Sequence, residues 1–246
     1  MIDLTNIREQ QAIRHCLQCK EVINTDNVFT EAGRKEVEIS GICEVCFDYS
    51  LDTTVEEYLD DLSEETGDGD YEILKLVRDI HGVFLAGGFW RSVQDPSNEI
   101  VEDYDLFFTG VQAKEEIEKQ LISMGFAQLF KCPQGELTTY KQGDHKVQLV
   151  TKFWYKSQED LIGSFDITAC CASWDGEKFI CNRRFKSDVM NKRIYLNKIT
   201  FPVATMNRIA KYSRKGYKLM GKTNMEFLEF INGIDFADFD MALYVD

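Results

Sequence analysis

Apolar residues recur between residues 71 and 200 with spacings that alternate between those of helices and those of strands. Within 71–80, Ile73, Leu76 and Val77 lie on one helical face, whereas the apolar run 83–86 is typical of a short buried strand. The same reasoning predicts further strands over 100–108, 126–130, 137–141, 146–153, 164–172 and 178–181, and helices over 111–124, 158–162, 203–210 and 223–231. We therefore expect an α+β fold with a mixed sheet flanked by helices, and with helices at the C-terminus.

Changes in composition divide the chain into three predicted parts. Residues 1–60 hold four closely spaced cysteines and the start of an acidic linker, and the stretch 64–70 has no apolar residue to bury. The helix and strand pattern occupies 71–200, and 201–246 form a C-terminal helical segment. We expect a small N-terminal module, a core domain and a C-terminal helical part.

The overall composition excludes several classes of protein. The 246 residues are 44% hydrophobic and 28% charged, which excludes disorder along the whole chain. The chain has no uncharged apolar run of about eighteen residues, and its first residues lack the basic start and apolar stretch of a signal peptide. We expect a cytoplasmic protein with no membrane partner.

The formal charge of −14 disfavours a general nucleic-acid coat, but it is unevenly distributed. Residues 178–222 contain 13 Lys or Arg and one acid, whereas 48–79 contain 12 acids and two bases. This basic segment favours a polyanionic ligand, the alternative being a solvated face.

Four of the eight cysteines form two Cys-x-x-Cys pairs, Cys16 with Cys19 and Cys43 with Cys46, with 23 residues between the pairs. In a reducing compartment this pattern indicates metal binding rather than disulfides. Four thiolates suit a tetrahedral structural Zn²⁺ site, and the metal would let so small a module fold. A redox role is disfavoured because it needs one such pair and not two.

Two glycines and two aspartates form the most informative motif. Gly87 and Gly88 follow the predicted strand 83–86, where glycine lets the backbone approach a phosphate and a following helix favours an anion. Asp103 and Asp105 lie two apart on the next predicted strand, so both carboxylates project from one face and can hold a divalent cation. Such hard oxygen ligands suit Mg²⁺, which keeps waters and substrate phosphates in its other positions.

Asp166 is the only acid in the otherwise apolar predicted strand 164–172. A carboxylate in that position needs a partner or a metal to offset the loss of its hydration. Asp166 is accordingly either a third metal ligand or a hydrogen-bonded residue at a turn or a sheet edge.

These residues resemble the DNA polymerase β-like nucleotidyltransferase superfamily, in its branch with Gly-Gly-x-x-Arg followed by Asp-x-Asp, as in tRNA nucleotidyltransferases and poly(A) polymerases. The resemblance covers residues 71–200 and is carried by Gly87, Gly88, Arg91, Asp103, Asp105 and Asp166. It implies a nucleotidyltransferase-like fold and transfer of a nucleoside monophosphate from an NTP, such as ATP, with release of pyrophosphate. The implied acceptor is an RNA 3′ end, including that of tRNA, a small molecule or a protein side chain.

The resemblance also implies a role for each of these residues. The first two carboxylates would bind a pair of Mg²⁺ or Mn²⁺ ions, and the third would complete the site and help to activate the attacking hydroxyl. The glycines and the arginine would hold the triphosphate. The metal ligands are thus Asp103, Asp105 and Asp166, and the triphosphate ligands are Gly87, Gly88 and Arg91.

Two-metal transfer also needs cationic groups to balance the charge of the leaving pyrophosphate. In the predicted C-terminal helix, Arg208 and Lys211 lie three apart and therefore share a face. We expect both to face the triphosphate, the alternative being an exposed face that balances the acidic tail.

Some positions depart from the branch. Ser92 follows Arg91 where an acid is usual, and 183–185 reads Arg-Arg-Phe where the branch has Arg-Arg-Asp-Phe. These departures favour a specialised, phage-type or toxin-type transferase over CCA addition. Two other classes stay open: a catalytically silent nucleotide-binding or interaction protein that binds a partner through the zinc module, and a zinc-bearing RNA-binding protein.

Overall fold

The computed structural model describes residues 14–51, 53–61, 69–95, 101, 103–220 and 225. Contacts within the chain divide it into two compact units, Met1–Asp52 and Thr53–Asp246. Each unit contains a buried apolar cluster of its own.

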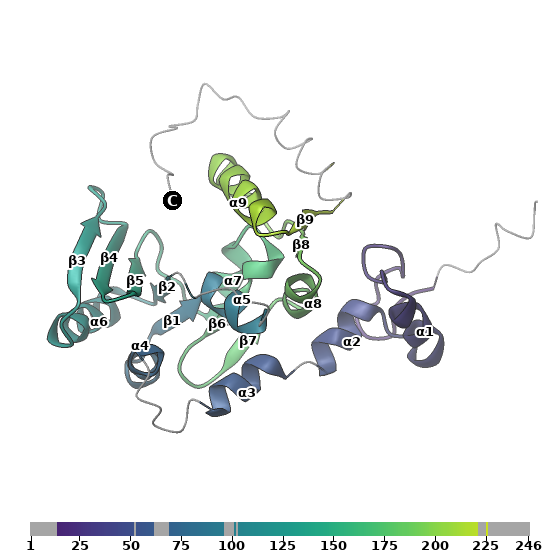
Figure 1. Cartoon of the computed structure of the whole chain (residues 1–246), viewed down its shortest axis with the longest axis horizontal. Helices are drawn as coiled ribbons and strands as arrows, with labels where there is room; N and C mark the ends of the chain where they lie inside the picture. Colours follow the sequence, from purple (N-terminus) through teal and green to yellow (C-terminus); the bar gives the residue numbers. More distant parts are fainter. Residues whose placement is uncertain are drawn as a thin grey trace, which may run out of the picture. The chain divides into compact units, whose positions relative to one another are not determined.

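Over residues 14–51, the N-terminal unit contains two short helices, α1 (Glu31–Ser40) and α2 (Glu44–Leu51) (Figure 1). Thr30 begins α1, because its side-chain oxygen accepts a hydrogen bond from the backbone N–H of Gly33. Gly41 ends α1 with a φ of 70°, a left-handed conformation that favours glycine. The buried cluster of this unit joins valines to cysteines and consists of Val28, Val37, Val45, Cys16, Cys43 and Cys46.

Glu44, the first residue of α2, is buried and ties this helix to the start of α1. Its Oε2 accepts hydrogen bonds from the backbone N–H groups of Phe29 at 2.7 Å and Thr30 at 2.9 Å. A Cβ atom on Gly33 would lie 2.1 Å from the same oxygen. Glycine at position 33 is therefore a condition for this close packing.

The second unit is built on a seven-stranded sheet in the order β3-β4-β5-β2-β1-β6-β7 (Figure 1). Neighbouring strands are antiparallel except for β2 and β5, which are parallel. The strands are β1 (Val83–Ala86), β2 (Tyr104–Phe108), β3 (Ala127–Lys131), β4 (Leu137–Gln142), β5 (His145–Val150), β6 (Ala172–Trp174) and β7 (Phe179–Cys181). A second sheet pairs β8 (Arg193–Ile194) with β9 (Lys218–Leu219).

The two faces of the large sheet are covered differently. Leu85 of β1 pairs with Leu106 of β2 on one face, which is buried against α4 (Gly69–Asp79) and α6 (Val111–Ser123). Phe84 pairs with Phe107 on the other face, where a smaller cluster includes Leu161 of α7 (Gln158–Ser164). Figure 1 shows α6 and α9 (Pro202–Arg214) on opposite sides of this sheet.

The remaining helices of the unit are short except for the last. They are α3 (Thr54–Asp61), α5 (Gly88–Gln94), a 3₁₀ turn (Thr168–Cys170), α8 (Phe185–Met190) and α9 (Pro202–Arg214). In the described part of the chain, no helix has the length and apolar character needed to cross a bilayer.

The α+β fold expected from the sequence is confirmed, and so is the order of its main elements. The expected strand over 83–86 is β1, and the expected helix over 111–124 is α6. At the start of α7, the Ser157 side chain accepts a hydrogen bond from the backbone N–H of Asp160. The helix expected over 223–231 lies outside the described residues apart from position 225.

The strand expected over 164–172 is wrong. Ser164 ends α7, Thr168–Cys170 form the 3₁₀ turn, and β6 begins only at Ala172. The backbone of this segment finds partners outside the large sheet, because Thr168 N donates to Tyr195 O and Asn197 N donates to Asp166 O. Asp166 therefore lies on an extended connection rather than in the middle of a strand.

Candidate active site

The turn between β1 and α5 is formed by the two glycines. Gly87 has a φ of 81° and a ψ of −129°, which an L side chain rarely adopts. A Cβ on Gly87 would lie 3.6 Å from Asp105 Oδ2, whereas a Cβ on Gly88 would meet no atom within 4 Å. Conformation thus requires glycine at position 87, while at position 88 the backbone borders open space that a ligand can approach.

Asp105 and Asp103 lie at the start of β2 but have different surroundings. Asp105 is half-buried, pairs with Ala86 of β1 and lies beside Gly87. Asp103 directly precedes β2, and its Oδ1 forms an ion pair with Lys146 Nζ of β5 at 2.6 Å. The parallel pairing of β2 with β5 explains this contact, because Tyr104 is opposite Val147 and the preceding residues are therefore neighbours.

Asp166 is buried, with 7% of its surface exposed, and it receives two bonds from α9. Its Oδ2 accepts hydrogen bonds from Thr205 Oγ1 at 2.9 Å and from Arg208 Nη1 at 2.8 Å. Arg208, which was expected to face a triphosphate, thus binds the third candidate carboxylate in this structure. These two bonds offset the loss of hydration of the Asp166 carboxylate.

A pocket of about 540 Å³ lies over the Phe107 face of the sheet and brings several candidate residues together. Its walls include Gly87, Gly88, Asp105, Asp166 and Arg208. Its volume is in the range of small-molecule sites. Asp103, Arg91 and Lys211 do not line this pocket as it is defined by the described residues.

Arg91 lies behind the wall of the pocket rather than in it. It is buried, and its guanidinium lies 5.2 Å from the ring centroid of Tyr212, a pocket residue of α9. The hydroxyl of Tyr212 accepts a hydrogen bond from Cys170 Sγ at 2.9 Å. Burial raises the pKa of both Tyr212 and Cys170. Lys211 is exposed on α9.

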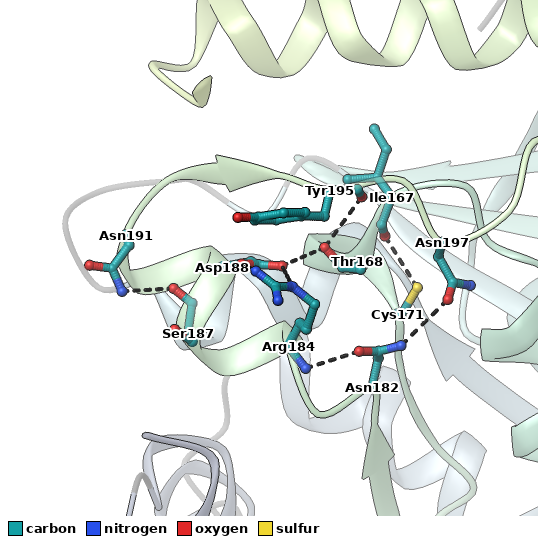
Figure 2. Close-up of polar contacts among 10 residues, drawn as sticks. All are labelled: Ile167, Thr168, Cys171, Asn182, Arg184, Ser187, Asp188, Asn191, Tyr195 and Asn197. Carbon is teal, nitrogen blue, oxygen red and sulfur yellow. Dashed lines mark hydrogen bonds and ion pairs between the residues drawn. The ribbon is translucent and has the colours of Figure 1, made fainter. Parts of the chain in front are cut away.

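A buried polar cluster supports the segment that carries Asp166 (Figure 2). Thr168 Oγ1 donates to Asp188 Oδ2 at 2.6 Å, and Arg184 Nε lies 3.2 Å from the same oxygen. The Arg184 guanidinium stacks over the Tyr195 ring at 3.6 Å. Asp188 is fully buried, and burial raises its pKa even though Arg184 opposes that shift. The cluster holds Thr168, two residues from Asp166, against α8.

Several of these partners were missed by sequence reasoning. No sequence motif marked Thr205, Cys170, Tyr212 or Lys146. Lys146 could be found only by pairing β2 with β5, which places it beside Asp103. The basic segment 178–222 is neutralised in part by acids, through the pairs Arg184 with Asp188, Lys186 with Glu56, Lys192 with Asp95 and Arg208 with Asp166.

The four cysteines of the N-terminal unit form one cluster. Their sulfur atoms all lie within 4.8 Å of one another, and Cys19 Sγ and Cys43 Sγ are 3.9 Å apart. Zn–S bonds of about 2.3 Å in a tetrahedron place sulfur atoms about 3.8 Å apart, so the cluster fits a zinc ion. The first pair lies in a turn closed by the bond from Cys16 N to Glu21 O, and the second lies at the start of α2.

The environment of the cluster also suits a thiolate set. Burial alone would raise the pKa of Cys16, but the backbone N–H groups of Cys43, Cys19 and Gln18 stabilise its thiolate and lower the pKa to about 6. The N–H of Cys43 lies 3.2 Å from Cys16 Sγ. Burial raises the pKa of Cys46 to about 11, and that of Cys43 further, so a cation is needed to hold these two thiols in the charged form.

Solved structures similar to this chain have a nucleotidyltransferase-like fold. A tRNA-processing enzyme in an apo form is 20% identical, with a TM-score of 0.50 over 65% of this chain and 46% of that one. A CCA-adding enzyme in complex with ATP is 14% identical, with a TM-score of 0.52 over 65% of this chain and 42% of that one. The CCA-adding enzyme of Thermotoga maritima in complex with tRNA is 12% identical, with a TM-score of 0.52 over 70% of this chain and 44% of that one.

The chain thus spans less than half the length of these three proteins, and at such identities the likeness shows the fold. No curated protein matches the chain. Its sequence does match the Gabija anti-defense 2 family, Gad2, over residues 49–192, which is more than half of the 246 residues. The chain therefore belongs to the Gabija anti-defense 2 family.

Proposed function

We propose that this protein is a metal-dependent nucleotidyltransferase, which moves a nucleoside monophosphate from an NTP to an acceptor with release of pyrophosphate. The observation that carries the proposal is one pocket bordered by Asp105, Asp166 and the Gly87–Gly88 turn, which are contributed by three separate segments of the chain. An RNA 3′ end is the acceptor we expect first, because the similar solved structures include tRNA-processing enzymes.

The carboxylates fit divalent cations in their chemistry, since they are hard oxygen ligands that border open space. Asp105 and Asp166 would hold Mg²⁺ or Mn²⁺ from the pocket, and Asp103 would join them by exchanging Lys146 for the metal. When bound, the cations would stabilise the charge that develops on the transferred phosphoryl group. A structural Zn²⁺ on the cluster of Cys16, Cys19, Cys43 and Cys46 would hold the N-terminal unit together.

The side chains around the pocket have complementary roles in the proposal. Asp166 Oδ2 already accepts a hydrogen bond from the Thr205 hydroxyl, so it is suited to accept one from the attacking hydroxyl as well. Arg208 would leave Asp166 and balance the charge of the triphosphate, with Lys211 nearby on the same helix. Gly87 and Gly88 would leave room for the phosphates, and Arg91 would support the pocket wall through Tyr212.

The test is incubation with each of the four α-labelled NTPs, Mg²⁺ or Mn²⁺, and total cellular RNA and protein. We expect wild type to transfer label and to release pyrophosphate, and the double variant Asp105→Asn, Asp166→Asn to do neither. Asp144→Asn, in an exposed turn, serves as the matched control. Absence of transfer and of pyrophosphate release from every NTP would contradict the proposal.

A second candidate function is a catalytically silent nucleotide-binding or interaction protein. It is favoured by the ion pairs of Asp103 with Lys146 and of Asp166 with Arg208, which satisfy both carboxylates without a metal. Nucleotide binding without pyrophosphate release, and without any effect of Mg²⁺ on the affinity, would select this function.

The name of the family indicates the biological setting that we propose. The protein would act in the cytoplasm as a phage-type inhibitor of the defence system that gives the family its name, with RNA or a component of that system as acceptor. Co-expression with this defence system tests the proposal. Loss of inhibition in Asp105→Asn would show that the pocket is required, and full inhibition by that variant would assign the effect to binding alone.

A further inference from the structure

Aromatic rings line part of the pocket. Phe153 follows β5 and Phe201 precedes α9, and their rings stack with centroids 6.5 Å apart at an interplanar angle of 19°. Phe153 is 47% exposed, although it lines a pocket. Phe130 of β3 is 51% exposed and also lines the pocket. Large aromatic surface thus faces the space inside the pocket.

Polar groups surround these rings and limit what can lie against them. Lys152 Nζ lies 4.4 Å from the centroid of Phe201 and 3.6 Å from Glu136 Oε2. Gln134 contributes an amide group to the pocket lining, and the amide of Gln148 also lines the pocket, opposite Asp105. A flat, apolar ligand with hydrogen-bonding edges and a nearby negative charge matches this combination of stacked rings, a cation and amides.

The distance between the rings and the carboxylates can be estimated from the strand register. Asp105 is opposite Gln148, and Lys152 follows Gln148 by four residues. At about 3.3 Å per residue, Lys152 lies at most about 13 Å along the chain from the level of Asp105. One sugar and one base reach across such a gap, so a nucleotide with its phosphate at the carboxylates places its base near Phe153.

We infer that Phe153, Phe201 and Lys152 form a subsite in which a nucleobase stacks during the proposed transfer. This inference rests on the proposed function and places the base of the substrate against Phe153 and Phe201. The base belongs either to the incoming NTP or to the terminal nucleotide of a single-stranded acceptor, and the shared chemistry is stacking with support from a cation.

The experiment measures binding of three probes to the full chain in Mg²⁺: ATP, a short single-stranded oligoadenylate, and inorganic tripolyphosphate, which has no base. Phe153→Ala and Phe153→Leu remove the aromatic ring, and Phe153→Trp keeps one. Trp154→Ala is the matched control, because Trp154 is the next residue, is 46% exposed and does not line the pocket. Circular dichroism and thermal unfolding establish that each variant is folded.

We expect Phe153→Ala and Phe153→Leu to weaken binding of a base-containing probe by about five- to fifty-fold. Phe153→Trp and Trp154→Ala should bind as wild type does, and tripolyphosphate should bind all variants equally. A loss confined to ATP assigns the subsite to the incoming nucleotide, and a loss confined to oligoadenylate assigns it to the acceptor.

Two results would overturn the inference, and they are distinguishable. If ATP and oligoadenylate bind wild type and Phe153→Ala or Phe153→Leu keeps the full affinity for both, stacking on Phe153 is excluded while the transferase proposal stands. If none of the three probes binds wild type, the proposed function fails and the subsite fails with it.

Discussion

Arg208 of α9 and Asp166, which are 42 residues apart in sequence, form an ion pair with 2.8 Å between Nη1 and Oδ2. The Asp166 side chain is 9% exposed and that of Arg208 is 39% exposed. The pair joins α9 to the segment that follows α7, and both of its residues line the pocket. A movement of α9 would therefore remove the positive charge of Arg208 from Asp166, the candidate third carboxylate.

The first prediction concerns this pair. Arg208→Ala should lower the free energy of unfolding by about 1–2 kcal/mol, because the buried carboxylate keeps only the Thr205 hydroxyl as a partner from α9, while the exposure of Arg208 limits the loss. Arg208→Lys should lose less stability than Arg208→Ala, because it keeps a positive charge at position 208. Urea unfolding measures the change, and Arg214→Ala, on an exposed position of the same helix, is the control. Equal effects of the two alanine variants would contradict the prediction.

The two adjacent glycines should respond differently to alanine. Gly87→Ala forces a side chain into a positive φ and should cost about 1–2 kcal/mol of stability. Gly88→Ala should change stability by less than about 0.5 kcal/mol, since its Cβ meets no atom. The methyl group at position 88 would occupy open space that borders the pocket and should weaken NTP binding. Thermal unfolding of both variants measures the stability losses, and an NTP titration measures binding. Equal stability losses in Gly87→Ala and Gly88→Ala would contradict the prediction.

Asp188 should be needed for the second unit to fold stably. Asp188→Ala leaves the Arg184 guanidinium, whose side chain is only 12% exposed, without its counterion and should cost about 3 kcal/mol. Asp188→Asn should cost less, because its amide oxygen can still accept the bond from Thr168. Denaturant unfolding ranks the two variants beside the exposed control Asp144→Ala. The reverse order would show that Asp188 does not act through these contacts.

The pH dependence of stability should carry a contribution from Glu118 of α6. Partial burial alone would raise the pKa of Glu118, but hydrogen bonds from Lys114 and Tyr140 lower it below its usual value of 4.5. A carboxylate with a lowered pKa in the folded state adds stability above the unfolded pKa, and loses it as the pH falls through the folded one.

Glu118→Gln should therefore cost about 0.5–1 kcal/mol at pH 7 and progressively less below about pH 4.5. Unfolding measured between pH 7 and pH 3 gives this difference. The exposed Glu115 of the same helix provides the control variant Glu115→Gln. A cost for Glu118→Gln that grows on acidification would contradict the assignment.

Removal of one cysteine of the cluster should unfold the N-terminal unit. Cys43→Ser should release bound zinc, because three thiolates and a hydroxyl bind the ion far more weakly than four thiolates. Zinc content per chain and circular dichroism measure both effects. Cys132→Ser, outside the cluster, should keep one zinc per chain, and zinc retained by Cys43→Ser would exclude the tetrahedral site.

Local patterns predicted much of the fold because they depend on neighbouring residues. The apolar run before Gly87 identified β1, and the cysteine spacing anticipated the cluster. The pattern around Asp103 and Asp105 predicted a strand over 100–108, and the structure has β2 over Tyr104–Phe108. Asp166 was harder to place. Its segment has the composition of a strand, but backbone bonds with Tyr195 and Asn197, far along the chain, determine its path.

The ion pairs of the site could not be read from the sequence for the same reason. Lys146 reaches Asp103 only because β5 lies parallel to β2, and Arg208 reaches Asp166 only because α9 returns over the Phe107 face. Neither contact follows from spacing within one element. Composition showed that residues 178–222 were basic, and three-dimensional packing decided which of those charges were already neutralised.

The parallel pairing of β2 with β5 has a consequence for synthesis on the ribosome. A tight turn cannot join two parallel strands, so a longer segment must lie between β2 and β5. The chain must therefore complete α6, β3 and β4 before β5 can pair beside Asp105. Thr205 and Arg208 emerge later still. A nascent chain that ends before α9 would expose Asp166 without these partners, so the pocket becomes complete only after α9 has been synthesised.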